Sequence, residues 1–126
     1  MSRQIIRTEK APGAIGPYNQ GVLAGGFLFT AGQIPLDPKT MEIVGVTAAE
    51  QARQALKNAQ GIVESAGLTM GDVVKATVFI RDMGQFAAIN EVYATFFPGE
   101  PPARSVVEVS RLPKDVLVEI ELVAYA

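Results

Sequence analysis

The stretch LVEIELVAY, residues 117–125, indicates a strand whose two faces differ in character. Successive side chains point to opposite sides of a strand, so alternate residues share a face. One face is entirely apolar and consists of Val118, Ile120, Leu122 and Ala124. The other face mixes apolar and acidic side chains: Leu117, Glu119, Glu121, Val123 and Tyr125. We expect the apolar face to pack against helices, whereas the mixed face needs a different cover.

A long helix suited to that apolar face is predicted from Thr47 to about residue 66. Thr47 and Glu50 have the spacing of a capping box, in which each side chain bonds the other residue's backbone N–H. Apolar residues then recur at spacings of three and four and form one stripe: Ala52, Leu56, Ala59, Val63 and Ala66. Gly67 is the expected C-terminal stop.

Apolar runs and turn residues predict the remaining elements. A second helix is expected from about residue 82 to Phe96, where Pro98-Gly99 ends it. Gly25-Gly26 marks a hairpin turn between two strands. Further strands are expected at residues 3–7, 27–31, 73–80, 104–109 and 117–125. The order β, β, β, α, β, α, β, β indicates an α+β fold, with a single mixed or antiparallel sheet and two helices on one face. We expect one domain spanning residues 1–126.

The second face of this sheet has no helix in the predicted fold to cover it. The strand at residues 73–80 is also apolar on both sides, apart from Lys75 and Thr77. A bare face of this kind would expose a large apolar patch to water. We therefore expect that subunits cover each other's sheets in a homo-oligomer.

The chain contains neither Cys nor His, which restricts its chemistry. Thiol nucleophiles, disulfides and thiolate metal sites are excluded, and the commonest general base and transition-metal ligand is missing. The sequence has no glycine-rich nucleotide loop and no acidic cluster with metal-ligand spacing. Catalysis would depend on Arg, Lys, Glu, Asp, Tyr, Ser, Thr or backbone groups.

Charge and hydropathy argue against two classes of partner. The chain has 11 basic and 13 acidic residues, and nucleic-acid binding usually needs a surplus of Lys and Arg. The first residues, MSRQIIRTEK, lack the apolar run of a signal peptide, and no segment approaches the roughly 20 apolar residues that span a bilayer. We expect a soluble cytoplasmic protein with no nucleic-acid or membrane partner.

Arg104 and Glu119 are the strongest candidates for chemistry. Arg104 enters a strand after PPA, and its guanidinium can bind a carboxylate through two parallel hydrogen bonds. A structural ion pair with Glu108, Glu119 or Glu121 is the alternative, and on spacing alone it is the commoner case. Glu119 and Glu121 share one strand face, about 7 Å apart. Paired carboxylates suit acid–base catalysis, although Glu121 is as well explained by an exposed or interface face.

Three further residues have both a binding and a structural interpretation. Tyr18 lies in a Gly- and Pro-rich ordered loop, residues 11–21, where its phenol could contact a substrate or pack the loop. Gly32, in TAGQ, could let a ligand approach the backbone or could simply end a strand. Asn90 could make a polar contact beside the apolar stripe of the second helix, or be an exposed helical residue.

Four strings together resemble the RidA family, also called YjgF-like reactive intermediate deaminases: IGPYNQG, TAGQIPLDP, PPARS and EVSRLPKDVLVEIE. The resemblance extends over essentially the whole chain. It implies a chorismate mutase-like fold and a homotrimer with a barrel-like core and sites between subunits. It also implies hydrolysis of 2-iminobutanoate and 2-iminopropanoate to 2-oxo acids and ammonia, without a cofactor or a metal.

By position, the resemblance assigns the substrate-carboxylate arginine to Arg104 and the water-positioning glutamate to Glu119. It assigns the other substrate contacts to Tyr18, Gly32, Asn90 and Val106. Three residues depart from the family, which often has Ser at Ala31, Cys at Val106 and an aromatic at Pro101. We expect the backbone N–H groups of Ala31 and Val106 to remain available to the substrate, and the loss of the aromatic to affect substrate size.

Two rival functions fit parts of the same pattern. A non-enzymatic trimeric module that binds small carboxylates would need only Arg104, and the presence of Glu119 favours hydrolysis over binding. An endoribonuclease is the second rival, against which the acidic pI of about 5.1 and the lack of His argue.

Overall fold

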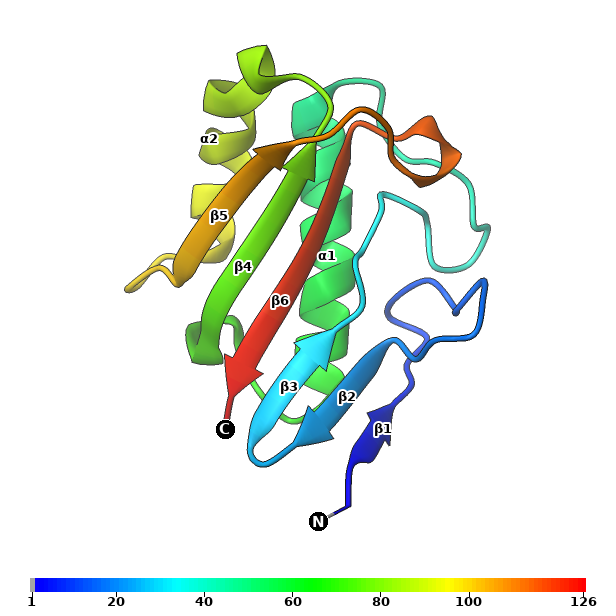
Figure 1. The fold of residues 1–126 in the computed structure, drawn as a ribbon, viewed down its shortest axis with the longest axis vertical. Helices are drawn as coiled ribbons and strands as arrows, with labels where there is room; N and C mark the ends of the chain where they lie inside the picture. The colour runs from blue at the N-terminus through cyan, green and yellow to red at the C-terminus, as the bar shows by residue number, and fades with distance from the viewer. Residues whose placement is uncertain (1) are drawn as a thin grey trace.

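The computed structural model describes residues 2–126, which form one six-stranded sheet with both long helices on one face (Figure 1). In chain order the elements are β1 (Gln4–Ile6), β2 (Gly21–Ala24), β3 (Phe27–Thr30), α1 (Ala48–Ser65), β4 (Val73–Ile80), α2 (Phe86–Phe96), β5 (Ala103–Glu108) and β6 (Val118–Tyr125). The strands lie in the order β1-β2-β3-β6-β4-β5. Only β4 and β5 pair in parallel, so the sheet is mixed. The predicted α+β class and element order are confirmed.

The capping box predicted at the start of α1 is present. Glu50 N donates to Thr47 Oγ1 at 3.2 Å, and Thr47 N donates to Glu50 Oε1 at 3.0 Å. At the other end Ala66 is the C-cap, and Gly67 takes a φ of +82°, a conformation that costs glycine little. The helix therefore begins and ends where local sequence directs it.

The second helix begins later than predicted. Asp82 caps a short 3-10 turn, Met83–Gln85, by accepting a hydrogen bond from Gly84 N at 2.8 Å, and α2 follows from Phe86. The predicted strands are correct to within a residue at each end. Leu117 was expected on the mixed face of the last strand, but it precedes β6 and packs against the core. That prediction was wrong because the strand alternation begins only at Val118.

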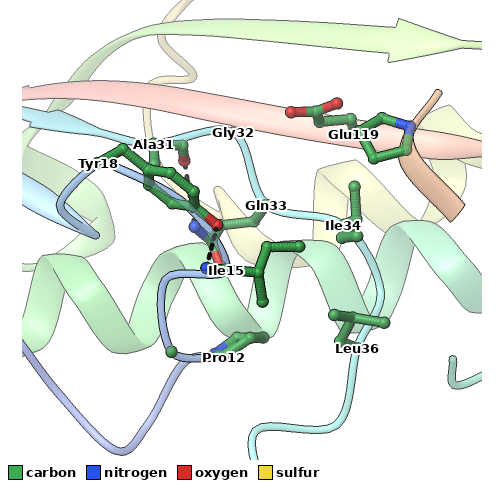
Figure 2. Close-up of a pocket in the computed structure, with 11 residues that line it drawn as sticks. Pro12, Ile15, Tyr18, Ala31, Gly32, Gln33, Ile34, Leu36 and Glu119 are labelled. Carbon is green, nitrogen blue, oxygen red and sulfur yellow. Dashed lines mark hydrogen bonds between the residues drawn. The ribbon is translucent and has the colours of Figure 1, made fainter. Parts of the chain in front are cut away.

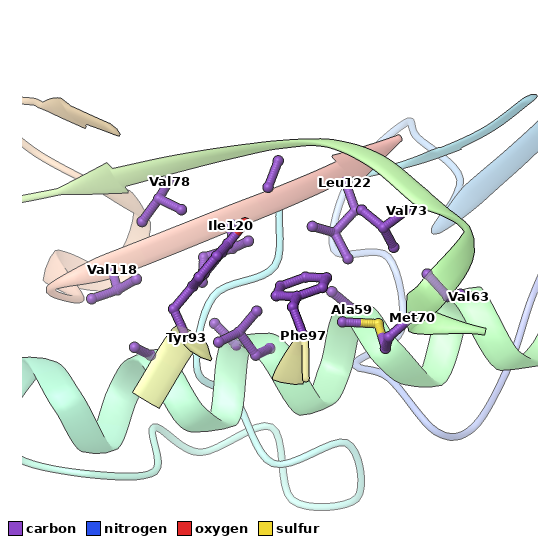
Figure 3. Close-up of a cluster of buried hydrophobic side chains, with 14 of the residues drawn as sticks. Ala59, Val63, Met70, Val73, Val78, Tyr93, Phe97, Val118, Ile120 and Leu122 are labelled. Carbon is purple, nitrogen blue, oxygen red and sulfur yellow. The ribbon is translucent and has the colours of Figure 1, made fainter. Parts of the chain in front are cut away.

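The main core lies between the sheet and the two helices (Figure 3). The apolar face of β6 is buried as predicted, with 0–1% exposure for Val118, Ile120, Leu122 and Ala124. The opposite face of the sheet carries no helix, and several of its large side chains are 40–51% exposed: Phe27, Phe29, Val107 and Tyr125. The rings of Phe27 and Tyr125 lie 4.7 Å apart there. The predicted exposed apolar patch is therefore a feature of the single chain.

A smaller apolar cluster packs the segment after β3 against the segment before β6. It consists of Ile34, Leu36, Leu112 and Val116. The buried Asn58 of α1 donates to the carbonyl oxygens of Ile34 and Leu36, at 3.1 and 2.9 Å. A buried amide with both partners in place holds this segment in one conformation. Within residues 2–126, no helix has the length and apolar character needed to cross a membrane.

Candidate active site

Glu119 lies on the face of β6 away from the helices, beside a hollow of about 310 Å³. Figure 2 shows its carboxylate reaching over the backbone of Gly32, with Ile34 and Leu36 below. Tyr18, Ala31, Pro113 and further apolar side chains complete the lining. The hollow thus combines one carboxylate with largely apolar walls.

The environment of Glu119 disfavours its charge. Burial raises the pKa of this half-buried carboxyl above its usual value, and the negative charge of Glu121 raises it further. A carboxylate with a raised pKa is a stronger base once it is ionised. The Glu119–Glu121 pair therefore supports a proton-accepting role for Glu119, with Glu121 as an exposed neighbour.

Gly32 is required by the position of Glu119. A Cβ at position 32 would overlap Glu119 Oε2 and would lie 2.9 Å from Glu119 Cδ. The missing side chain thus makes room for the catalytic candidate of the same chain. This role was not predicted, because the partner is 87 residues away in sequence and becomes a neighbour only through the sheet.

Tyr18 reaches the same hollow from the loop that precedes β2. Its hydroxyl oxygen accepts a hydrogen bond from Ile15 N at 3.2 Å, and its side chain is 45% exposed. The buried Gln20 anchors this loop by donating to the carbonyl oxygens of Ala11 and Pro12. Tyr18 is therefore both a loop-packing residue and one whose ring remains accessible.

The expectation for Ala31 is wrong. Its backbone N–H donates to the carbonyl oxygen of Gln20 at 2.8 Å, so it is not available to a substrate.

The Val106 N–H, in contrast, points away from the neighbouring strand. Val109 N donates toward β4, to Ile80 O at 2.8 Å, and N–H groups alternate in direction along a strand. Val106 N–H therefore points to the free edge of β5, while its side chain packs against the core.

Arg104 lies on β5, at the edge of the sheet, and faces α2. Its Nη1 donates to Asn90 Oδ1 at 2.7 Å. Its guanidinium carbon is 4.7 Å from the ring centroid of Tyr93 and 5.5 Å from that of Phe86. A hollow of about 550 Å³ lies beside it, lined in part by Asn90, Tyr93 and Pro101.

The alternative of a structural Arg104–glutamate ion pair is not found. Within residues 2–126 the single side-chain ion pair joins Arg111 and Asp115, at 2.8 Å. Glu108 instead accepts a hydrogen bond from Met83 N at 2.7 Å. Arg104 thus has an amide and two aromatic rings around it, none of which neutralises its charge.

In one chain, Arg104 and Glu119 do not share a pocket. Arg104 is in register with Ala76, which is fully buried beneath the helices, whereas Glu119 is in register with Phe79 on the other face. The two groups therefore project from opposite faces of the sheet. Neither of the two hollows contains both groups.

No group of acidic side chains in the described part of the chain is arranged to hold a metal ion.

Comparison with known proteins identifies the family. The family described as Endoribonuclease L-PSP, the YjgF/RidA family, matches residues 8–126. This chain belongs to the YjgF/RidA family. The predicted resemblance is confirmed, and the match covers every residue of both hollows.

Several relatives in the YjgF/RidA family match this chain over nearly their full length. A RutC family protein of Pyrococcus horikoshii is 57% identical, over 98% of each chain. The 2-iminobutanoate/2-iminopropanoate deaminase of Escherichia coli is 56% identical, over 94% of each chain. The crystal structure of E. coli TdcF with bound serine has a TM-score of 0.94 and 53% identity, and the match covers 98% of each chain.

Sequence reasoning missed two members of the Arg104 site in this YjgF/RidA chain. Phe86 and Tyr93 fall within the predicted second helix, but neither was singled out as a site residue. They lie four residues before and three residues after Asn90, so all three share one helical face. That spacing was a visible signal, but only the pairing of β5 shows that this face meets an arginine.

Proposed function

We propose that this protein is a cytoplasmic hydrolase that converts 2-imino acids, such as 2-iminobutanoate and 2-iminopropanoate, into 2-oxo acids and ammonia. We further propose that it works as a homotrimer with sites between subunits and needs no cofactor. One observation supports this most directly: an arginine with no carboxylate partner among residues 2–126 and a carboxylate of raised pKa lie on opposite faces of one sheet.

Arg104 is suited to bind the substrate carboxylate. Asn90 occupies only one nitrogen of the guanidinium, so other donors remain for a carboxylate. The E. coli TdcF structure contains bound serine, a small molecule with a carboxylate next to a nitrogen-bearing carbon. A 2-imino acid has the same arrangement of groups.

The assembly follows from the two faces of the sheet. The exposed apolar face needs a cover, which supports the proposed homotrimer. In the arrangement that we propose, a second chain covers this face with its β5 edge next to the first chain's Glu119 hollow. Tyr18, Gly32 and Glu119 would then come from one subunit. Arg104, Asn90 and the Val106 N–H would come from its neighbour.

The reaction requires one base and one anchored substrate. Arg104 holds the carboxylate and sets the position of the imine carbon. Water adds to that carbon while Glu119 accepts one of its protons, and Glu119 then returns this proton to the former imine nitrogen, which gives a carbinolamine. The hydroxyl proton of the carbinolamine passes to the nitrogen as the C–N bond breaks, so ammonia leaves and the 2-oxo acid remains. Positioning and general-base catalysis, worth about 10²–10⁴-fold for the base, suffice for an electrophile that also hydrolyses unaided.

The test is to generate 2-iminobutanoate in place with an amino-acid oxidase or dehydratase and to follow its decay. Arg104→Ala should abolish the acceleration. Arg104→Lys should recover little, because an ammonium does not reproduce the planar fork of donors. Wild-type rates from Arg104→Ala would refute the proposed role of Arg104.

Glu119→Gln separates the hydrolase from a module that only binds small carboxylates. A hydrolase variant should keep its affinity for 2-oxobutanoate and lose the acceleration. If the variant keeps the full acceleration, Glu119 is not the base and the mechanism is wrong.

A further inference from the structure

Helix α2 presents three side chains to one guanidinium. Phe86, Asn90 and Tyr93 are spaced by four and three residues, so they form one face of the helix. Asn90 Oδ1 accepts the Arg104 hydrogen bond at 2.7 Å, and the two rings lie 5.5 and 4.7 Å from the guanidinium carbon. Both rings are within the distance at which a cation is attracted by an aromatic face.

Tyr93 is the rigid member of this group. It is 6% exposed, compared with 36% for Phe86, and its ring also packs at 4.8 Å on the ring of Phe97. Figure 3 shows Tyr93 projecting from α2 into the core toward Ile120 of β6. Packing from several sides restricts the ring to one orientation, so it provides a fixed surface for Arg104.

The hydroxyl group of Tyr93 does not explain why this residue is buried here. Its oxygen is buried and has no hydrogen-bond partner among the described residues. A buried hydroxyl without a partner costs free energy, so the ring must account for the contribution of this residue. The contact that the ring makes with a charged group is the one with Arg104.

We propose that Tyr93 is a positioning residue that acts through Arg104. Its ring supports the guanidinium from one face while Asn90 fixes one nitrogen, so the remaining donors are oriented before a carboxylate arrives. Aromatic rings are suited to this task because they attract the cation without competing for its donors as a glutamate would. This inference rests on the proposed role of Arg104 in binding the substrate carboxylate.

The experiment measures binding of 2-oxobutanoate, the stable product, to the full-length protein by calorimetry. Tyr93→Leu should weaken binding by about threefold to thirtyfold, the range expected for loss of a cation–π contact. Tyr93→Phe keeps the ring and should bind within twofold of the wild type. In the imine assay, Tyr93→Leu should raise KM with little change in kcat, because Glu119 is untouched.

Val92→Ala is the matched control for disturbance of α2. Val92 is 7% exposed, neighbours Tyr93 and packs in the core, so its truncation should lower the thermal midpoint without weakening 2-oxobutanoate binding. Phe86→Leu tests the same idea at a more exposed position and should weaken binding about twofold to threefold. It keeps the proposal testable if Tyr93→Leu does not fold.

Two results would overturn the inference. One is a folded Tyr93→Leu variant, or Phe86→Leu in its place, that binds 2-oxobutanoate like the wild type while Arg104→Ala does not. In that case Arg104 keeps its proposed function and only the role of Tyr93 fails. The other is a loss of affinity in Val92→Ala as large as that in Tyr93→Leu, which would assign the effect to helix packing.

Discussion

The Glu119 hollow and the Arg104 hollow hold their functional side chains in position in different ways. The Glu119 hollow depends on the close approach of backbone segments: a glycine leaves room for the carboxylate, and buried amides hold the flanking segments. The Arg104 hollow lies at the edge of the sheet and depends on side chains from one face of α2. We infer that the first is sensitive to added volume and the second to altered polarity.

Among the variants that compare the two hollows, the largest expected effect comes from adding one methyl group to the Glu119 hollow. Gly32→Ala places a Cβ where Glu119 Oε2 lies, so the carboxylate must move. Loss of a correctly placed base should lower the rate of imine hydrolysis about 100-fold or more. Gly71→Ala is the control, because a Cβ there meets one atom, at 3.4 Å. Full activity in Gly32→Ala would show that the position of the Glu119 carboxylate is not critical for hydrolysis.

Asn90 tests the polarity of the Arg104 hollow. Asn90→Ala removes a hydrogen bond to a charged group and should weaken 2-oxobutanoate binding about tenfold. Asn90→Asp should weaken it more, because the new carboxylate pairs with Arg104 and competes with the ligand. If Asn90→Asp binds more tightly than Asn90→Ala, Arg104 does not receive the ligand carboxylate.

The raised pKa of Glu119 predicts opposite effects of pH on activity and stability. Hydrolysis needs the ionised carboxylate, so the rate should fall as pH drops through the raised pKa. Stability should change the other way. Because the folded-state pKa lies above the unfolded-state value, ionisation of Glu119 destabilises the fold as pH rises between the two.

Glu119→Gln checks the stability half of this prediction. The variant should have a higher thermal midpoint than the wild type at pH 7, by a small margin, and the difference should vanish below pH about 4. A lower midpoint at pH 7 would mean that the Glu119 charge is stabilised in the assembled protein. Glu121→Gln should reduce the shift, since the Glu121 charge is its second cause.

The smallest expected effect lies outside the functional groups of both hollows. Arg111 and Asp115 form an exposed ion pair four residues apart, with side chains 77% and 61% exposed. Asp115→Asn should leave the midpoint of urea denaturation close to that of the wild type. Since the pair is exposed, its small contribution should decrease further in high salt. A clearly lower midpoint for Asp115→Asn would contradict this.

The local elements were predictable because they depend on neighbouring residues. The capping box at Thr47, the positive φ at Gly67 and the alternation along β6 each follow from a few adjacent side chains. The errors came from contacts that local sequence does not contain. Leu117 turned toward the core, and the Ala31 N–H was already bonded to Gln20.

The sequence by itself determined the α+β class, the exposed apolar face and the two functional candidates, since periodicity and residue type are local properties. Only the tertiary structure decided that Arg104 and Glu119 face opposite ways. The face on which a side chain lies depends on the register between β5, β4 and β6, and a slip of one residue in that register would reverse it. Register is set by pairing between distant segments, so no stretch of neighbouring residues encodes it.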